Sequence, residues 1–145
     1  MKRDYFTLEL ADVDDAENQP AIHITYEGPD GLGADDVTTD GGVDVAFRYR
    51  TPVDDPEASG VFGVTDRLTG DFILEVNADA NTVERLVSAA RDYGETAPDA
   101  DGWYRVVLAE DGETFFETAK RTLLVYDEGG DLRRKHSLIP SGVEL

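Results

Sequence analysis

The feature that most constrains the fold of this chain is a repeated alternation of apolar and polar side chains over short segments. In residues 5–10, Phe6, Leu8 and Leu10 face one way, and Tyr5, Thr7 and Glu9 face the other. A period of two residues is typical of a strand that buries one face. We therefore expect strands at 5–10, 21–27, 43–50, 60–66, 71–77, 103–109, 114–119, 122–127 and 132–139.

Turn signals separate several of these segments into hairpins. Arg67-Leu68-Thr69-Gly70 lies between two expected strands, Asp111-Gly112 is a strong two-residue hairpin signal, and Gly129-Gly130 precedes the last segment. The nearly continuous apolar run Phe72-Ile73-Leu74 predicts a central strand that is covered on both faces. Residues 28–41 are rich in glycine and aspartate and predict a long polar loop.

One segment has the periodicity of an amphipathic helix, which we expect at about 81–93. Asn81 suits the N-cap, and Glu84 three residues later completes a variant of the capping box. Arg91 would complement the dipole in the last turn, and Gly94 would end the helix. The apolar residues that recur at this spacing are Val83, Leu86, Val87, Ala90 and Tyr93.

These elements predict an α+β fold, with a curved, mainly antiparallel sheet of about seven to nine strands and one long helix packed on it. Residues 115–124 also suit one helical face, but strand is the preferred interpretation. Leu, Ile, Val and Phe make up about 25% of the 145 residues, enough for so charged a chain to fold. The length predicts a single domain over 1–145.

The charge of the chain indicates the solvent in which it works. There are 32 acidic and 13 basic side chains, a formal net charge of -19, and only 3 of the basic residues are lysines. Such self-repulsion is tolerable where salt screens it, and molar salt reduces the Debye length to about 3 Å. We therefore expect a halophilic, cytoplasmic protein that binds hydrated cations non-specifically. No segment has the length and apolar character of a membrane span.

The basic side chains are unevenly distributed, and this asymmetry defines the candidate ligand site. Residues 1–119 carry a net charge of -20, whereas residues 120–145 carry +1. On an expected strand at 132–139, Arg134 and His136 share one face, and a hairpin would bring Lys120 and Arg121 close to its far end. Arg134, His136, Lys120 and Arg121 are therefore the candidate anion-binding residues, with Arg48, Arg50 or Trp103 as walls of the site. The alternative is that these cations pair with neighbouring acids.

Several classes of site are excluded or disfavoured by the residues present. The chain has no cysteine, which excludes thiol catalysis, zinc–thiolate sites and disulfides. No nucleotide-binding or catalytic motif is present, and Ser137 and His136, adjacent on a strand, would point to opposite faces. The acidic run at 12–18 departs from a calcium loop because it lacks the fifth-position ligand and has Glu17 in place of the required glycine. We predict no metal, no cofactor and no identified catalytic residue.

Two segments carry a resemblance to known proteins. They are Arg121-Thr122-Leu123-Leu124-Val125-Tyr126-Asp127-Glu128 and His136-Ser137-Leu138-Ile139-Pro140-Ser141-Gly142-Val143. In these segments the chain resembles short, acidic haloarchaeal proteins of uncharacterised function. The resemblance implies a halophilic cytoplasm and a stand-alone domain, and it carries no activity.

Three functions are compatible with the sequence. The first is a non-enzymatic module that binds a protein partner or forms a homodimer, suggested by the sheet-rich build and the apolar tail at 138–145. The second is a protein that binds a small anionic ligand, or an enzyme, with its site near Arg134 and His136. The third and least favoured is a nucleic-acid accessory protein, because counterion release weakens as salt rises.

We expect the structure to be lost progressively as salt is removed. Far-ultraviolet circular dichroism, followed while KCl falls from molar to about 0.1 M, should show unfolding because the screening length grows to about 10 Å. Unchanged stability at low salt would contradict the halophile interpretation.

Overall fold

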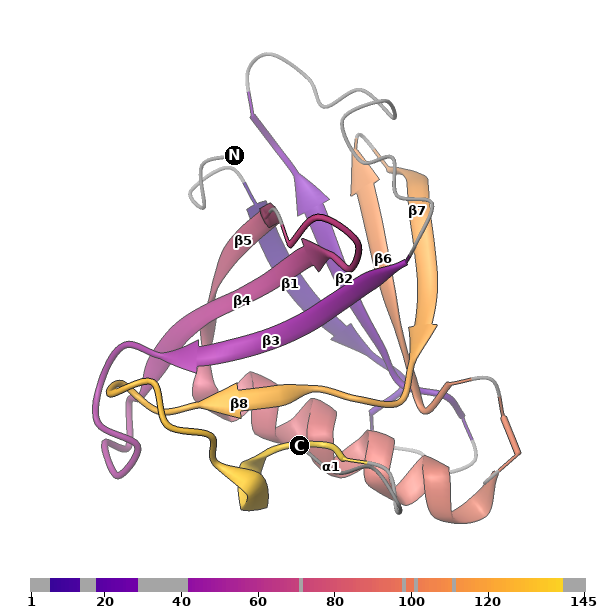
Figure 1. Cartoon of the computed structure of the whole chain (residues 1–145). Coiled ribbons are helices and arrows are strands. Elements are labelled where there is room, and N and C mark those ends of the chain that lie inside the picture. The colour runs from indigo at the N-terminus through magenta and orange to yellow at the C-terminus, as the bar shows by residue number, and fades with distance from the viewer. Residues whose placement is uncertain are drawn as a thin grey trace.

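The computed structural model describes residues 6–13, 18–28, 42–70, 72–97, 99–100, 102–110 and 112–139. These residues form an α+β fold with two mixed four-stranded sheets, one α-helix and a short 3-10 helix (Figure 1). The acidic run at 14–17, most of the predicted loop at 28–41 and the end of the apolar tail at 140–145 lie outside the described residues.

The first sheet has the strand order β1-β2-β6-β7. Strands β1 and β2 pair antiparallel, as do β6 and β7, whereas β2 and β6 pair parallel. The β6–β7 hairpin turns at Gly112, whose φ of 82° lies in the left-handed region that favours glycine. The bounds are β1 (Phe6–Ala11), β2 (Ala21–Tyr26), β6 (Tyr104–Glu110) and β7 (Glu113–Lys120).

The second sheet has the strand order β5-β4-β3-β8. Two antiparallel pairs join β3, β4 and β5, and β8 adds to β3 in parallel. Gly70 ends the turn between β4 and β5 with a φ of 76°. The bounds are β3 (Val43–Tyr49), β4 (Ser59–Asp66), β5 (Phe72–Asp79) and β8 (Leu124–Tyr126).

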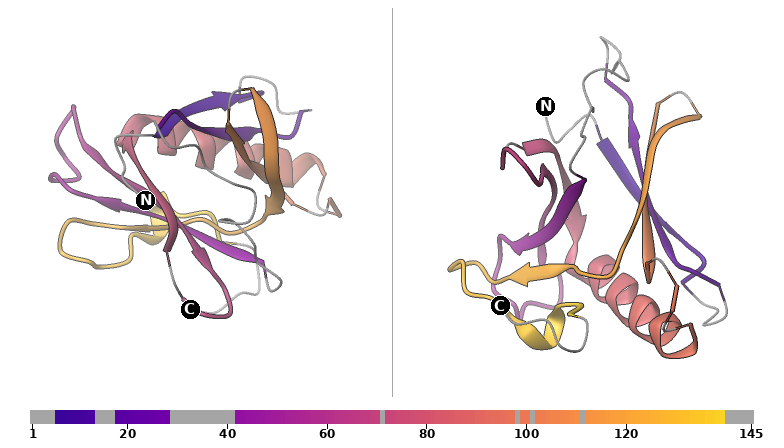
Figure 2. Two further views of the ribbon diagram at one scale, coloured as in Figure 1. Left: turned by 90° about the horizontal axis from the view of Figure 1, so that it is seen from above. Right: turned by 45° about the vertical axis from the view of Figure 1, so that its right-hand side comes forward.

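The core lies between the inner faces of the two sheets. Alternation along the strands directs apolar side chains inward, and β1 of the first sheet lies beside β5 of the second (Figure 2). The helix α1 (Ala80–Thr96) lies across one end of both sheets and buries its apolar stripe there. Each fully buried leucine, isoleucine or phenylalanine side chain stabilises the fold by about 1.5–3 kcal/mol. Examples are Ile22, Ile24, Phe47, Phe62, Leu74, Leu86 and Leu108.

The prediction of an α+β fold with mainly antiparallel strands and one long helix is confirmed, since four of the six strand pairs in the described residues are antiparallel. The strands divide into two sheets where one was expected, and each sheet contains one parallel pair, β2–β6 or β3–β8. Both parallel pairs join strands that are distant in sequence, which alternation cannot reveal because it describes each strand separately. The segment at Phe72–Leu74 begins an edge strand, β5, and not a central one. Residues 113–120 form a strand, as preferred over a helix.

The prediction of a strand over 132–139 was also wrong. Two isolated bridges, Leu123–Leu138 and Tyr126–Leu132, are the remnants of the expected hairpin, and a 3-10 helix, η3 (Arg134–His136), lies between them. The buried Ser137 explains the change, because its Oγ accepts from the backbone N–H of Val125 at 2.9 Å and donates to the carbonyl of Arg133 at 2.8 Å. A side chain thus replaces the ladder hydrogen bonds of a strand.

Both ends of the helix differ from the prediction. The N-cap is Asp79, two residues before Asn81, and its side chain makes no capping hydrogen bond. The helix continues past Gly94 to Thr96, and Arg91 donates to the carbonyl of Ser137 at 3.1 Å instead of lying in the last turn. Gly94 is needed for a different reason: a Cβ atom there would lie 2.6 Å from Cδ2 of Trp103.

We expect Gly94→Ala to destabilise the fold by about 1–3 kcal/mol, because the Trp103 ring would have to move. Alanine in an exposed helix interior normally stabilises by roughly 1 kcal/mol over glycine. A double-mutant cycle with Trp103→Leu, measured by denaturant unfolding, should therefore reverse the sign of the Gly94→Ala effect. The same effect in both backgrounds would contradict a steric role for Gly94.

Candidate functional site

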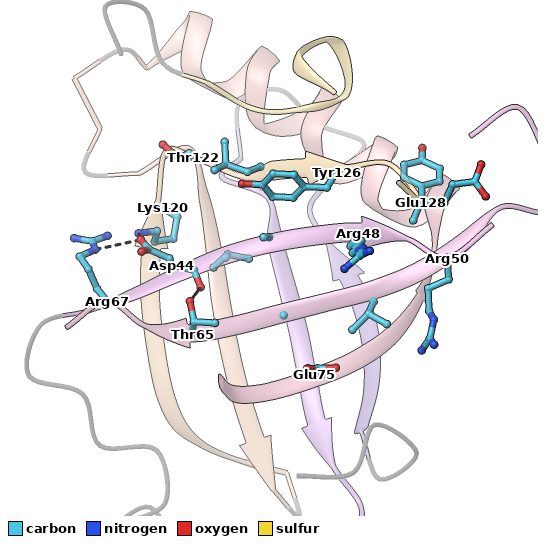
Figure 3. A pocket seen from close by; sticks show the side chains of 16 residues that line it. Asp44, Arg48, Arg50, Thr65, Arg67, Glu75, Lys120, Thr122, Tyr126 and Glu128 are labelled. Carbon is cyan, nitrogen blue, oxygen red and sulfur yellow. Dashed lines mark hydrogen bonds and ion pairs between the residues drawn. The ribbon is translucent and has the colours of Figure 1, made fainter. Parts of the chain in front are cut away.

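The outer face of the second sheet carries a hollow of about 950 Å³ (Figure 3). It lies on the side of the sheet that faces away from the core. Such a volume falls within the range of small-molecule sites in proteins. Its lining includes Asp44, Ala46, Arg48, Arg50, Gly63, Arg67, Glu75, Lys120, Leu124 and Tyr126.

The register of the four strands explains why this face is hollow. One row across the sheet consists of Glu75, Gly63, Ala46 and Leu124, so its two central positions hold the smallest side chains. The next row places Arg48 directly beside Tyr126, and both side chains stand on the same face. The small residues of the middle strands form the floor of the hollow, and the longer side chains around them form its walls.

At one end of the hollow, two cations are bound by groups of the protein itself. Asp44 Oδ1 lies 3.2 Å from Arg67 Nε and 3.9 Å from Lys120 Nζ. Both cations also donate to the carbonyl of Val43, at 3.3 Å for Arg67 and 2.7 Å for Lys120. Burial lowers the pKa of Lys120, the nearby Arg67 lowers it further, and Asp44 opposes the shift. These cations are held by the protein itself.

The other end of the hollow carries two arginines that are not engaged in ion pairs. Within the described residues, the guanidinium groups of Arg48 and Arg50 make no ion pair and no side-chain hydrogen bond. Figure 3 shows Arg48 below the Tyr126 ring, and Arg50 at the end of β3 with its side chain directed away from Glu128. The lining holds four basic and three acidic side chains, a charge of +1 in a chain of -19.

Comparison with known proteins identifies the family but not an activity. The whole chain, residues 1–145, matches the model described as "Family of unknown function (DUF5793)". The chain belongs to this family. No curated protein and no solved structure matches it. The DUF5793 match supports the resemblance to uncharacterised proteins, and a haloarchaeal origin stays a prediction.

His136 lies away from the hollow, in a cluster that joins three parts of this DUF5793 chain. Its Nδ1 lies 3.8 Å from Oε1 of Glu84 on α1, and its ring meets Tyr49 of β3 edge-on with centroids 6.2 Å apart. The Tyr49 hydroxyl donates to the same Glu84 oxygen at 3.3 Å. Burial raises the pKa of Tyr49, and the Glu84 carboxylate raises it further. Arg134, two residues earlier, is exposed.

The four predicted site residues therefore lie in three places. Lys120 lines the hollow, whereas Arg121 donates to the carbonyl of Ala100 and lies over the Trp103 ring, with 5.9 Å between Cζ and the centroid. Arg134 and His136 lie on η3. The two arginines expected as walls, Arg48 and Arg50, do line the hollow, and Trp103 does not.

Sequence reasoning missed the residues that give the hollow its shape. Gly63, Ala46, Glu75 and Tyr126 were not singled out. A glycine within a strand often marks a site where a ligand or another backbone approaches closely, so Gly63 carried a usable signal. The role of Ala46 could not be read, because it depends on which strands lie beside β3.

In the part of the chain that the structure describes, no group of three or more His, Asp and Glu side chains could hold a metal ion. Among those residues, no helix has the length and apolar character needed to cross a membrane.

We expect His136→Ala to lower the free energy of unfolding by about 1 kcal/mol, through loss of the Glu84 and Tyr49 contacts. Arg134→Ala, two residues away and exposed, is the matched control and should leave the stability unchanged. Denaturant unfolding of both variants measures this. Equal stability of the His136 variant and the parent chain would show that the cluster does not hold the C-terminal segment in place.

Proposed function

We propose that this chain binds a small anionic molecule in the hollow on the outer face of the second sheet. The observation that carries the proposal is the pair Arg48 and Arg50, which are unpaired among the described residues although acidic side chains outnumber basic ones by 32 to 13. The proposal keeps the small-anion hypothesis of the sequence analysis and moves its site from Arg134 and His136 to the hollow.

The chemistry of the lining suits an acid group joined to an apolar body. A guanidinium presents planar, paired donors that match a carboxylate or phosphate in a bidentate geometry. Val61, Leu124 and Tyr126 offer apolar and aromatic surface beside these donors. Screening by molar salt removes long-range attraction, so affinity must come from direct hydrogen bonds and apolar contact.

A protein–protein role has less support from the described surface. Among the side chains that the structure describes, Leu68, at 73% exposure, is the one large apolar side chain that is exposed. Protein-binding surfaces are marked by contiguous apolar patches, not by single side chains. The ligand hypothesis is therefore preferred to a partner or homodimer, and no catalytic step is proposed.

The test is titration of the ¹⁵N-labelled chain with benzoate and with uncharged benzamide, at a salt concentration that keeps it folded. Benzoate should shift amide signals of the hollow, around Arg48, Gly63 and Tyr126, and benzamide should not. Arg48→Gln should weaken benzoate binding about 10-fold or more, since a charge-assisted hydrogen bond contributes about 1.5–3 kcal/mol. Arg134→Gln is the matched control and should have no effect.

Three outcomes would overturn the proposal. The first is that neither compound shifts the signals of the hollow. The second is that benzamide binds as tightly as benzoate, which would remove the role of charge. The third is that Arg134→Gln weakens benzoate binding and Arg48→Gln does not, which would return the site to the C-terminal segment.

A further inference from the structure

The half-buried Glu75 lies on the β5 side of the hollow, opposite the free arginines. Glu75 of β5 pairs in register with Gly63 and shares the outer face with it. Within the described residues, its carboxylate makes no ion pair and no hydrogen bond. Figure 3 places Glu75 on the far side of β4 from Arg48. A purely anionic ligand held by Arg48 would therefore lie near an uncompensated negative charge.

The sheet geometry places Arg48 and Glu75 on either side of β4. Arg48 and Glu75 lie on β3 and β5, with β4 between them, and their rows differ by two residues. Strands about 5 Å apart, with a rise of about 3.3 Å per residue, put their Cα atoms roughly 12 Å apart. Gly63 lies between them and has no side chain to fill the gap. A molecule lying over Gly63 could contact both charged groups.

The side chains beside Glu75 and Arg48 in their two rows of the hollow are apolar or aromatic, so the ligand needs an apolar part as well as two charges. Ala46 and Leu124 continue the row of Glu75 and Gly63, and Val61 and Tyr126 flank Arg48 in the next row. An aromatic or branched apolar group can pack on such a surface, with the Tyr126 ring as one wall. A nucleotide fits poorly, because some of its several negative charges would lie beside Glu75 and Glu128, which make no ion pair among the described residues.

Building on the proposed function, we infer that the ligand is a zwitterion of the α-amino-acid type with an apolar or aromatic side chain. Its carboxylate pairs with Arg48 and Arg50, its ammonium group donates to Glu75, and its side chain packs against Tyr126 and Leu124. Each charge of the ligand then compensates a charge that the described residues leave unpaired. An acid without an amino group compensates the arginines alone.

The test compares L-phenylalanine with 3-phenylpropionate, which lacks the amino group, and with 2-phenylethylamine, which lacks the carboxylate. L-phenylalanine should bind about 10-fold or more tighter than either analogue, as judged by titrations of amide shifts in the hollow. Glu75→Gln should reduce the affinity for L-phenylalanine to that for 3-phenylpropionate. The variant should bind 3-phenylpropionate as tightly as the parent chain does, or more tightly. Glu9→Gln, a strand carboxylate on the outer face of the other sheet, is the matched control.

A second variant tests the position of the ligand. Gly63→Val would fill the gap over β4, and because Gly63 lies in a regular strand and lacks a positive φ, valine there needs no unusual backbone. With circular dichroism confirming the fold, this variant should bind none of the three compounds. Unchanged binding of L-phenylalanine to Gly63→Val would overturn the inferred position.

The outcomes separate this inference from the proposed function. If 3-phenylpropionate binds as tightly as L-phenylalanine and Glu75→Gln affects neither, the hollow binds anions and the zwitterion inference is wrong. If none of the three compounds shifts signals of the hollow, the inference and the proposed function both fail. If 2-phenylethylamine binds most tightly, the site prefers cationic ligands, and the inference and the proposed function are both overturned.

Discussion

The passage of the chain from β7 to β8 is the connection on which the arrangement of the two sheets depends. β7 is an outer strand of the first sheet and β8 an outer strand of the second, so residues 121–123 cross directly between them. The buried Tyr104 of β6 donates to the carbonyl of Thr122 at 2.6 Å, and Lys120 donates to the carbonyl of Val43. Side chains of the first sheet thus hold the crossing, and through it the second sheet, in place.

The crossing also determines what lies on either face of the second sheet. It adds β8 to β3 in parallel, which places Leu124 and Tyr126 beside Ala46 and Arg48 on the outer face. The chain then turns at Gly130 and returns toward α1, where His136 contacts Glu84 and Leu138 pairs with Leu123. One short segment therefore supplies both a wall of the hollow and the attachment of the C-terminal part to the core.

The individual strands, two hairpin turns and the helix were predictable because the residue patterns that specify them lie within each segment. Alternation identified β1, β2 and β3 nearly to the residue, and the turn residues before Gly70 and around Gly112 identified two hairpins. The helix was identified from its apolar stripe, but its ends were not. Asp79 begins it without a side-chain cap, and the contact between Gly94 and Trp103 joins residues from two separate elements. Similarly, the segment around Ser137 is not the expected strand, because the Ser137 side chain accepts a hydrogen bond from β8. No pattern within that segment predicts this contact.

The sequence by itself determined that this chain is a strand-rich, strongly acidic member of the α+β class with one amphipathic helix. Those properties follow from residue types and their spacing along the chain. The tertiary structure decided which strands are neighbours, and so brought Arg48, Gly63 and Glu75 from three strands to one face. The physical reason is that register between strands depends on backbone pairing across the whole sheet, whereas the side chains of each strand specify only which of its faces is buried.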